Sequence, residues 1–264
     1  MKKALKYIIF LGLVIFMDMA VYEPYALKIT SYNLENPLLS NLKIVFASDF
    51  HIAPYKWEKW RLNKIVDKIN AENPDLVILG GDYTNRHNKK ASLSPKDIAK
   101  TLQKIKAPKV AVLGNHDSYF SKKDVKNALQ QANIPVLDNA HTELRLQNKT
   151  VFIAGVSDYD TDKPDINKAI NQTKKPLIFV THSPDVFQQL NGRADIAFAG
   201  HTHGGQIILP FLGALITNIK SGRKYTYGLL YEQQKPLIVS SGLGTSIIPI
   251  RFNNLPEIVS VKSK

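Results

Sequence analysis

The first half of the chain alternates short apolar runs with amphipathic segments, and this alternation constrains the fold more than any other feature of the sequence. The runs at 43–48, 76–82 and 109–113 have the length and apolar content of buried strands. The segments between them carry apolar residues at helical spacing, as Leu62 and Ile69 do in the first. A strand–helix alternation of this kind predicts a sheet of parallel strands joined by right-handed crossovers.

Turn and capping residues mark the ends of the predicted helices. Asn73-Pro74 stops the first helix, because the residue before a proline disfavours helical backbone. Residues 94–97, Ser-Pro-Lys-Asp, form a capping box with proline at the first helical position and begin the second helix. Ser121 and Asp124 predict the start of a third helix.

The second half of the chain is dominated by strands. Residues 144–156 predict a hairpin around Asn148-Lys149, and two more buried strands, 177–182 and 196–203, each end in histidine. Shorter strand-like runs follow at 206–209, 225–231, 236–241 and 257–261. Mixed strands with helices outside them predict two sheets packed face to face. The expected fold class is therefore α/β, a four-layer α-β-β-α sandwich of two mixed sheets.

Composition bounds the partners and the chemistry. Beyond the N-terminal segment about 230 residues remain, which suits one large domain. The formal charge of +13 favours anionic partners, although the scattered lysines also fit a solvated surface. Nucleic acid is not an expected partner, because no RNA-binding signature or basic aromatic helix is present. The absence of cysteine excludes disulfides and thiolate metal sites.

The N-terminus predicts a membrane anchor. Lys2, Lys3 and Lys6 precede an apolar run from Tyr7 to Met17. No small-residue cleavage site follows, so an uncleaved signal anchor is favoured over a removed signal peptide. We therefore divide the chain into residues 1–25, the anchor or signal segment, and residues 26–264, one folded domain. The lysines favour a domain outside the inner membrane; an anchor lying on the cytoplasmic face is the alternative.

Polar clusters lie at the carboxyl ends of the predicted buried strands. Ligands bind at that edge of open α/β sheets, so we expect these side chains to converge. A single Asp or His at a strand end is more often a loop or capping residue, but a whole series of them is poorly explained as caps. The clusters are Asp49-Phe50-His51, Gly81-Asp82, Gly114-Asn115-His116-Asp117, Thr181-His182 and Gly200-His201-Thr202-His203-Gly204-Gly205.

The residue types in these clusters indicate a site for two divalent ions. Imidazole and carboxylate, with one amide, suit Mn, Fe, Zn, Ni or Co better than Ca, which prefers oxygen ligands. His201 and His203 flank one residue, so on an extended segment they point to the same side. Asp82 has two carboxylate oxygens and can bridge. With two divalent ions and the negative charges of Asp49 and Asp82, the net charge of the site would be about +2. That charge suits a negatively charged phosphoryl group.

The order of the motifs, D-x-H, GD, GNH, H and GHTH, resembles that of the calcineurin-like metallophosphoesterase superfamily over most of residues 43–261. The last motif reads GHTHGGQ from Gly200 to Gln206 and resembles a membrane-anchored bacterial subgroup. That subgroup includes a UDP-2,3-diacylglucosamine pyrophosphatase and less defined phosphodiesterases. Residues 241–246 (SGLGTS), Arg251 and Pro256-Glu257 also resemble the subgroup.

The resemblance implies a hydrolase and a role for each matching residue. Paired ions, with Mn the leading choice, would hold a hydroxide that attacks a phosphodiester or pyrophosphate bond. His116 is expected to face the phosphate and to stabilise the transition state or protonate the leaving oxygen. One ion would be bound by Asp49, His51 and His203, the other by Asn115, His182 and His201, with Asp82 bridging both.

Two departures from related enzymes limit what the resemblance implies. Protein phosphatases of the superfamily read GDxxDRG, whereas this chain has Asn85 before Arg86, so the carboxylate that orients the catalytic histidine there is missing. Purple acid phosphatases place a ligating tyrosine at the position of Asn85, so a tyrosinate-bound ferric site is not expected.

Two apolar segments favour a lipid-linked substrate such as UDP-2,3-diacylglucosamine. Ile207 to Ile216 follows the last motif, and Ile247 to Ile250 precedes Arg251. We expect them to form an apolar rim that faces the bilayer, with Arg251 reaching the phosphate; the alternative is that both are buried under neighbouring loops. A non-catalytic alternative is a membrane-tethered protein that binds an anionic polymer. The complete ligand set favours catalysis.

Overall fold

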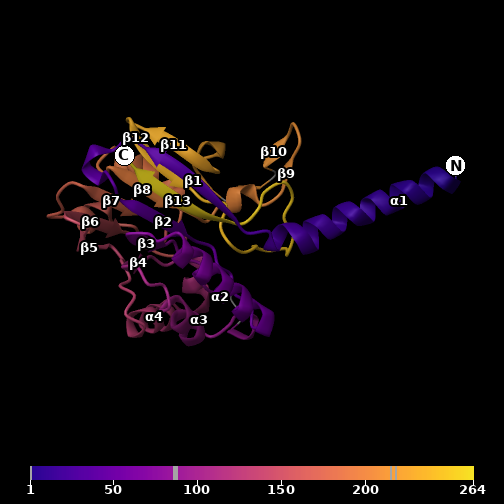
Figure 1. The fold of residues 1–264 in the computed structure, drawn as a ribbon, viewed down its shortest axis with the longest axis horizontal. Coiled ribbons are helices and arrows are strands. Elements are labelled where there is room, and N and C mark those ends of the chain that lie inside the picture. Colours follow the sequence, from indigo (N-terminus) through magenta and orange to yellow (C-terminus); the bar gives the residue numbers. More distant parts are fainter. Residues whose placement is uncertain (1, 86–88, 215, 218) are drawn as a thin grey trace.

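The computed structural model describes residues 2–85, 89–214, 216–217 and 219–264 of the chain. Arg86 of the GD motif and Leu215 of the first apolar segment lie outside them. Two sheets pack face to face with helices on their outer sides, as Figure 1 shows. The predicted α-β-β-α sandwich of two mixed sheets is confirmed.

The first sheet carries the strands of the sequence's strand–helix alternation. Its order is β1 (Lys28–Leu34), β13 (Glu257–Ser263), β2 (Lys43–Ala47), β3 (Leu76–Leu79) and β4 (Lys109–Ala111). Strands β2, β3 and β4 are parallel, as predicted, while β13 pairs antiparallel with β2 and makes the sheet mixed. The helices that follow them along the chain are α2 (Lys56–Ala71), α3 (Pro95–Leu102) and α4 (Asn115–Gln131).

The second sheet has a parallel centre and antiparallel edges. Its order is β11 (Gly228–Glu232), β12 (Lys235–Val239), β8 (Ile196–Ala199), β7 (Leu177–Val180), β6 (Lys149–Gly155) and β5 (Ala140–Leu146). The predicted hairpin is β5–β6, which turns at residues 147–148. Two short helices, α5 (Ile166–Ile170) and α6 (Phe187–Leu190), belong to this half, and β9 (Ile208–Leu209) pairs with β10 (Gly213–Ala214) in a separate small hairpin.

Alternation along the strands divides the interior into three cores. Successive side chains of a strand point to opposite faces, so Ile44 and Phe46 of β2 enter the core between the sheets, while Val45 and Ala47 enter the core under the helices. Strands β7 and β8 divide in the same way between the central core and a third core that includes α5 and α6. Strands buried on both faces explain why their sequences are continuously apolar.

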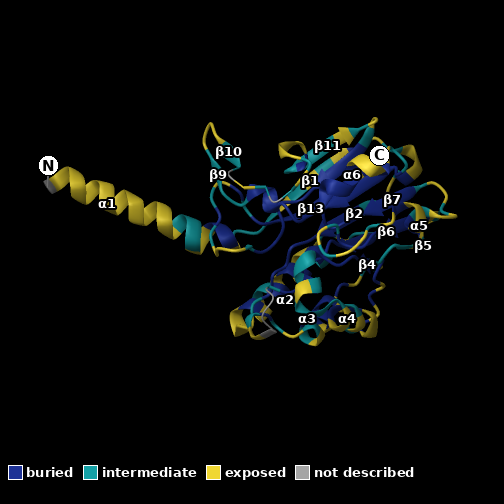
Figure 2. Ribbon diagram, turned by 180° about the vertical axis from the view of Figure 1, so that it is seen from behind, coloured by how far each residue is buried: buried dark blue, intermediate teal, exposed yellow. Residues whose placement is uncertain are grey.

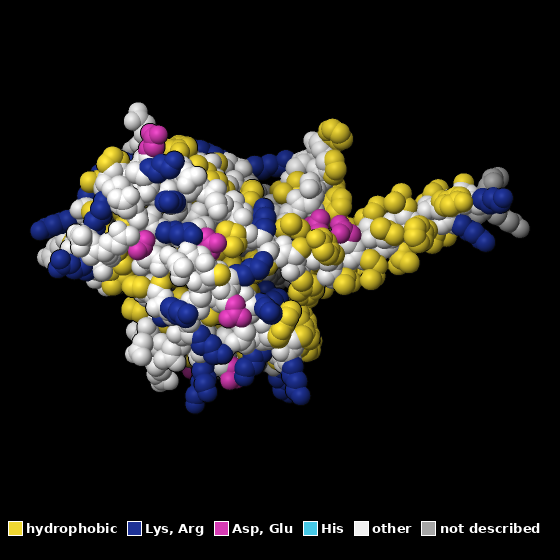
Figure 3. Space-filling view, viewed as in Figure 1, with side chains coloured by type: hydrophobic (Ala, Val, Ile, Leu, Met, Phe, Trp, Pro, Cys, Tyr) yellow, Lys and Arg dark blue, Asp and Glu magenta, His cyan; other side chains and the backbone are white. Residues whose placement is uncertain are grey.

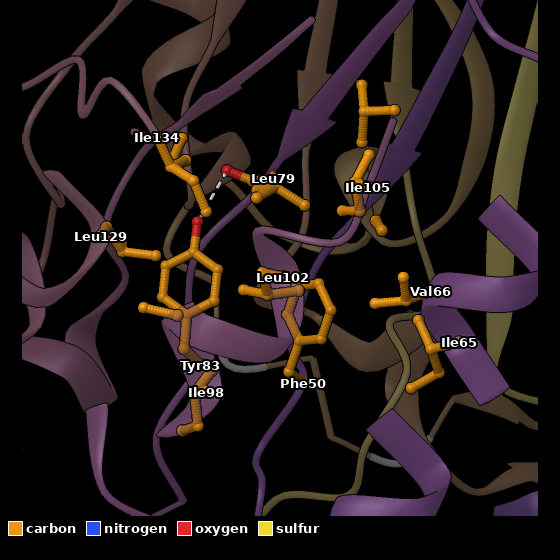
Figure 4. Packing of buried hydrophobic residues seen from close by; sticks show 14 of the residues in the cluster. Phe50, Ile65, Val66, Leu79, Tyr83, Ile98, Leu102, Ile105, Leu129 and Ile134 are labelled. Carbon is orange, nitrogen blue, oxygen red and sulfur yellow. Dashed lines mark hydrogen bonds between the residues drawn. The ribbon is translucent and has the colours of Figure 1, made fainter. Parts of the chain in front are cut away.

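The core under α2, α3 and α4 holds the loops that carry polar motif residues. Phe50, next to Asp49, stacks on Tyr83, next to Asp82, with ring centroids 5.4 Å apart (Figure 4). The Tyr83 hydroxyl donates to the backbone carbonyls of Leu79 and Val112 at 3.1 and 3.0 Å. Packing of these aromatic neighbours therefore fixes where the adjacent carboxylates lie.

The helix starts agree with the capping residues in one case and differ in another. Ser94 caps α3, because its hydroxyl accepts from the Asp97 amide at 3.1 Å. The third helix starts earlier than predicted, at Asn115 directly after Gly114. It is interrupted at Ser121, whose φ of 174° is extended, and Ser121 then caps the remaining turns as expected.

The N-terminal helix α1 (Lys2–Met17) projects away from the sandwich (Figures 1 and 2). Its described side chains are exposed, among them Tyr7 at 74% and Ile8 at 67%. The helix continues through two short irregular turns to Tyr25, and the 23-residue stretch Lys3–Tyr25 is long and apolar enough to cross a membrane by length and composition. A helix that is apolar on every side is typical of a segment buried in a protein core or in a membrane.

Phe198→Ala tests the central core. Phe198 is fully buried between the sheets, and its ring stacks on Phe46 at 5.3 Å. We expect the free energy of unfolding to fall by about 3–5 kcal/mol, measured by denaturant unfolding in detergent. Tyr231→Ala, at a 60% exposed position on β11, is the matched control and is expected to cost little. Equal losses in both variants would show that Phe198 is not part of a tightly packed core.

Candidate metal centre

The polar clusters meet where the carboxyl ends of strands from both sheets come together. Asp49, Asp82 and Asn115 follow β2, β3 and β4 of the first sheet, and His182 and His201 follow β7 and β8 of the second. The two sheets are tied at this point, since the His201 amide donates to the Asp49 carboxylate at 3.0 Å. All the predicted ligand residues are brought together here, and all except the half-buried Asn115 are buried.

One group of three side chains gathers around the end of β2. His51 Nε2 lies 3.1 Å from His203 Nε2, and His203 Nε2 lies 3.6 Å from Asp49 Oδ1. These residues can hold a metal ion between them, and they are the set that the sequence predicts for the first ion.

A second group gathers around the end of β7. The Asn115 side-chain oxygen lies 3.2 Å from both His182 Nε2 and His201 Nδ1, and those two nitrogens are 3.3 Å apart. These residues correspond to the set predicted for the second ion.

Asp82 stands between the two groups and offers the same oxygen to both. Its Oδ2 lies 3.5 Å from His51 Nε2 and 3.3 Å from His182 Nε2. Its other oxygen, Oδ1, accepts a hydrogen bond from the His116 amide at 2.9 Å, which fixes the carboxylate plane. One oxygen of Asp82 therefore faces a histidine of each group.

The donor spacing fits metal ions. Atoms that share a metal at about 2.0–2.2 Å lie about 3.0–3.6 Å from one another, and the separations above fall in that range. Burial lowers the pKa of His51 and of His203 to about 3, so both imidazoles are neutral and can offer a ring-nitrogen lone pair to a metal ion. The Nδ1 atoms of these two residues are also buried without a protein partner.

Backbone and carboxylate partners orient two of the histidines. The His182 Nδ1–H donates to the Gly80 carbonyl at 2.8 Å, so the ring directs Nε2 toward the centre. His201 presents Nδ1 to the centre, and its Nε2 lies 3.3 Å from Asp160 Oδ2. The sequence did not reveal Asp160, because it lies in a loop after β6 with two other aspartates close by and no motif around it.

Asp117 joins the loops after β3 and β4. Its buried carboxylate accepts from the backbone amides of Asp82, Tyr83, Thr84 and Gly114 at 2.8 to 3.1 Å. Burial and the nearby Asp82 raise the pKa of Asp117 to about 7, while the bonds from Gly114 and Thr84 oppose that rise. The sequence placed Asp117 in a polar cluster but gave it no role. In the structure it holds the loop after β3, which carries Asp82, against the loop after β4.

The backbone at the centre is forced into an uncommon conformation. Asp49, His51, Asp82, His201 and His203 all have positive φ, between 44° and 70°. Such residues cost of order 1–3 kcal/mol each and persist where surrounding contacts hold them. Gly114 is required for close approach, since a Cβ there would collide with the Asp82 carboxylate and lie 2.8 Å from the His182 ring.

His116 lies beside the centre rather than within either ligand group described above. Its ring meets that of His51 edge to face, with centroids 4.6 Å apart. Its Nδ1 lies 2.6 Å from the backbone carbonyl of Asn85, so Nδ1 carries the proton and donates it. Asn85 occupies the position of the carboxylate that protein phosphatases use, and here its main chain takes over the orienting contact.

Arg251 does not reach the centre, and the expectation that it binds phosphate is corrected. Its side chain is fully buried, and its guanidinium donates to the carbonyls of Ser241, Gly242 and Asn254 at 2.8, 3.2 and 3.0 Å. It also donates to Gly244. Its two terminal nitrogens donate to main-chain carbonyls, so the guanidinium supports the 241–254 loop instead, while Nε is buried without a hydrogen-bond partner.

Residues of the centre line a pocket of about 260 Å³, and two further grooves border it, each lined in part by the 244–250 loop. An apolar groove of about 110 Å³ is lined by Ile207, Ile216, Ile247 and Ile248 and reaches His203. A second groove of about 250 Å³ leads from His51 to Tyr25, Tyr55 and Trp57. The apolar segments are not buried under loops, since Ile216 and Ile247 are 63% and 68% exposed; Phe211, however, lies at the tip of the β9–β10 turn rather than in the groove.

Comparison with known proteins identifies the family. The model of the calcineurin-like phosphoesterase family matches residues 42–205, which include every ligand candidate. An uncharacterized metallophosphoesterase of Aquifex aeolicus is 30% identical, over 92% of this chain and 94% of its own length. The chain belongs to the calcineurin-like phosphoesterase family.

The chain is also similar to a named phosphodiesterase in sequence and to a solved structure in fold. The phosphodiesterase YaeI of Escherichia coli is 27% identical, over 83% of this chain and 81% of its own length. The crystal structure of a 5'-nucleotidase precursor from Thermus thermophilus shares the fold, with a TM-score of 0.52 at 13% identity over 77% of this chain and 49% of that one. As a calcineurin-like phosphoesterase the chain is a hydrolase of phosphoesters, and the non-catalytic polymer-binding alternative is set aside.

Asp82→Ala is expected to abolish hydrolysis and lower the bound metal, because the oxygen shared by both ligand groups is lost at once. Elemental analysis of the purified variant measures metal per chain, and Asp162→Ala, at a surface ion pair, is the matched control. Retention of two ions per chain by the Asp82 variant would contradict the bridging role.

His116→Gln separates catalysis from metal binding. Because Nδ1–H donates to the Asn85 carbonyl, Nε2 is the ring nitrogen that would act on the substrate. We expect kcat to fall by about 100-fold or more while metal content stays near wild type. His116 also lies within ligand distance of His51 and Asp82, so a metal-binding role makes the opposite prediction. Loss of metal in His116→Gln would show that His116 is a ligand.

Proposed function

We propose that this phosphoesterase hydrolyses phosphodiester or pyrophosphate bonds with two divalent ions, Mn the leading candidate. Asp49, His51 and His203 would bind one ion and Asn115, His182 and His201 the other, with Asp82 shared. The observation that carries the proposal is the single oxygen of Asp82 facing both ligand groups. Mixed imidazole, carboxylate and amide donors suit a first-row transition ion.

The protein residues would supply orientation and proton transfer. Bound ions provide Lewis-acid charge and an activated water for phosphoryl transfer. His116 lines the pocket at the centre, and its Nδ1–H donates to Asn85; in the doubly protonated form its Nε2–H could donate to a phosphoryl or leaving-group oxygen. Asp117 and Asp160 act through other residues: Asp117 fixes the two loops, and Asp160 orients His201.

We infer that the substrate is lipid-linked, as the resemblance to the membrane-anchored subgroup suggests. Support comes from the groove lined by Ile207, Ile216, Ile247 and Ile248, which shares His203 and Ser246 with the surroundings of the centre. An acyl chain in such a groove gains up to about 0.8 kcal/mol for each methylene removed from water. A glycolipid diphosphate such as UDP-2,3-diacylglucosamine fits this description.

We propose further that residues 1–25 anchor the chain in a membrane and residues 26–264 form the catalytic domain. Support comes from the exposed apolar helix α1 and from its length. The lysines before the apolar run favour the outer side of a bacterial inner membrane for the domain, with the cytoplasmic face as the alternative.

Turnover of bis-p-nitrophenyl phosphate and of acylated substrates tests these proposals. We expect hydrolysis of the small diester to disappear with a chelator and to return with added Mn²⁺; turnover that survives chelation would contradict the metal mechanism. With acylated phosphodiesters in micelles, kcat/KM should rise by up to about fourfold per methylene until the groove is filled.

The Ile247→Ser/Ile248→Ser double variant is expected to remove the gain with chain length and leave the small diester unaffected. Tyr231→Ser, an exposed position on the far sheet edge, is the matched control and should retain the gain. Equal kcat/KM for short and long chains in the wild type would exclude a lipid-binding groove, whereas the metal-dependent reaction would stand.

A further inference from the structure

An aromatic surface lies next to the base of α1 and is separate from the apolar groove at the centre. Tyr25, Tyr55, Trp57 and Trp60 have exposed fractions of 47%, 58%, 46% and 64%. Trp57 contacts two of them, Tyr25 edge to face at 5.4 Å and Tyr55 in a stack at 5.9 Å between centroids. We call these four residues the aromatic surface.

Basic side chains continue this surface along one face of α2. Trp57, Trp60, Lys64 and Lys68 recur at helical spacing, and Lys64 Nζ lies 5.4 Å from the Trp60 ring centroid. The only acidic residue in the first turn, Glu58, is buried and paired with Arg61 at 2.7 Å. The exposed face therefore combines indole rings with ammonium groups, and Asp67 is an exposed carboxylate between Lys64 and Lys68. Figure 3 shows apolar side chains (yellow) beside basic ones (dark blue) below the base of α1.

A groove runs between the aromatic residues and the lysines. Its volume is about 550 Å³, with Leu27 and Ile65 contributing to its apolar wall and Lys64 and Lys68 at its rim. Tryptophan and tyrosine are enriched where a bilayer meets water, because their rings are apolar with one polar atom. Lysine stems lie along apolar surface and place the ammonium near phosphate groups.

The end of α1 is fixed beside this surface. The Met19 carbonyl accepts from the Arg251 amide at 2.9 Å, and the Glu23 carboxylate accepts from the Asn253 amide at 2.8 Å. Tyr25 then packs on Trp57. If α1 crosses a bilayer, α2 would therefore lie next to the surface of that bilayer.

We propose that the aromatic surface and the α2 lysines sit in the headgroup region of the bilayer that α1 enters, bound to anionic phospholipid. This second contact would hold the domain down on the membrane. It would also place the groove from His51 to Tyr25, Tyr55 and Trp57 against the lipid, so that a lipid-linked substrate reaches the centre without leaving the bilayer surface. The inference rests on the proposed anchoring by α1.

The chain's own fluorescence can test the contact, because its two tryptophans, Trp57 and Trp60, both lie in this surface. The full-length protein is reconstituted in vesicles of phosphatidylcholine with one-third phosphatidylglycerol, and flotation after a high-salt wash reports anchoring. Phospholipids brominated on the acyl chain near the headgroup quench tryptophan inside the bilayer, and iodide quenches tryptophan in water.

We expect brominated lipid to reduce the emission at least twofold and iodide to have little effect. Trp57→Phe and Trp60→Phe assign the signal to each ring. The matched control is Glu143→Trp in the variant lacking both native tryptophans, because β5 lies at the end of the molecule away from α1 (Figures 1 and 2). That tryptophan should be quenched by iodide and not by brominated lipid.

The outcomes separate the two proposals. Flotation with native tryptophans quenched by iodide and not by brominated lipid would overturn the aromatic contact and leave the anchor standing. Failure to float after the salt wash would overturn the anchor and this inference together, while metal-dependent diester hydrolysis would still report on the enzyme itself. Flotation with quenching by brominated lipid supports both.

Discussion

The carboxylate of Asp82 is the point on which the centre depends. One oxygen faces a histidine of each ligand group, the other accepts the His116 amide, and the Asp82 amide donates to Asp117. Moving this residue would disturb both ligand groups and the orientation of His116 together. Its neighbour Tyr83 packs in the core under α2, α3 and α4, which makes such a movement costly. The positions of the ligand candidates therefore depend directly on the fold.

The same coupling explains how the strained backbone persists. Ligands with positive φ would relax if their loops were free, but the residues between them are tied to the interior: Phe50 lies in the core between Asp49 and His51, and the Gly244 amide donates to the Asp49 carbonyl. Arg251 contributes here by binding several carbonyls of the 241–254 loop. The buried Arg251 guanidinium holds the conformation of the loop beside the centre, so Arg251 would affect a substrate only through that loop.

Sequence patterns predicted the parts of this structure that depend on local order. Buried strands, helix caps such as Ser94 and polar residues at strand ends are read from neighbouring residues, and the strand ends converge because parallel strands share an edge. Contacts that join distant segments without a pattern were missed: Asp160 beside His201, and the Asn85 carbonyl beside His116. Arg251 was wrongly placed at the phosphate, because its sequence position beside an apolar segment does not distinguish a buried guanidinium from an exposed one.

The length of α1 limits where the domain can lie. The stretch from Lys3 to Tyr25 has 23 residues, so it extends about 35 Å as a helix, only slightly more than the hydrocarbon thickness of about 30 Å. No long spacer separates it from the domain, since β1 begins at Lys28. If α1 spans a bilayer, residues near its end, including Tyr25 and its neighbour Trp57, must lie at the bilayer surface. The groove from His51 to Tyr25 and Trp57 lies on this side, so under the proposed anchoring the short connection would bring the centre to lipid-borne phosphate and restrict its reach into the surrounding water.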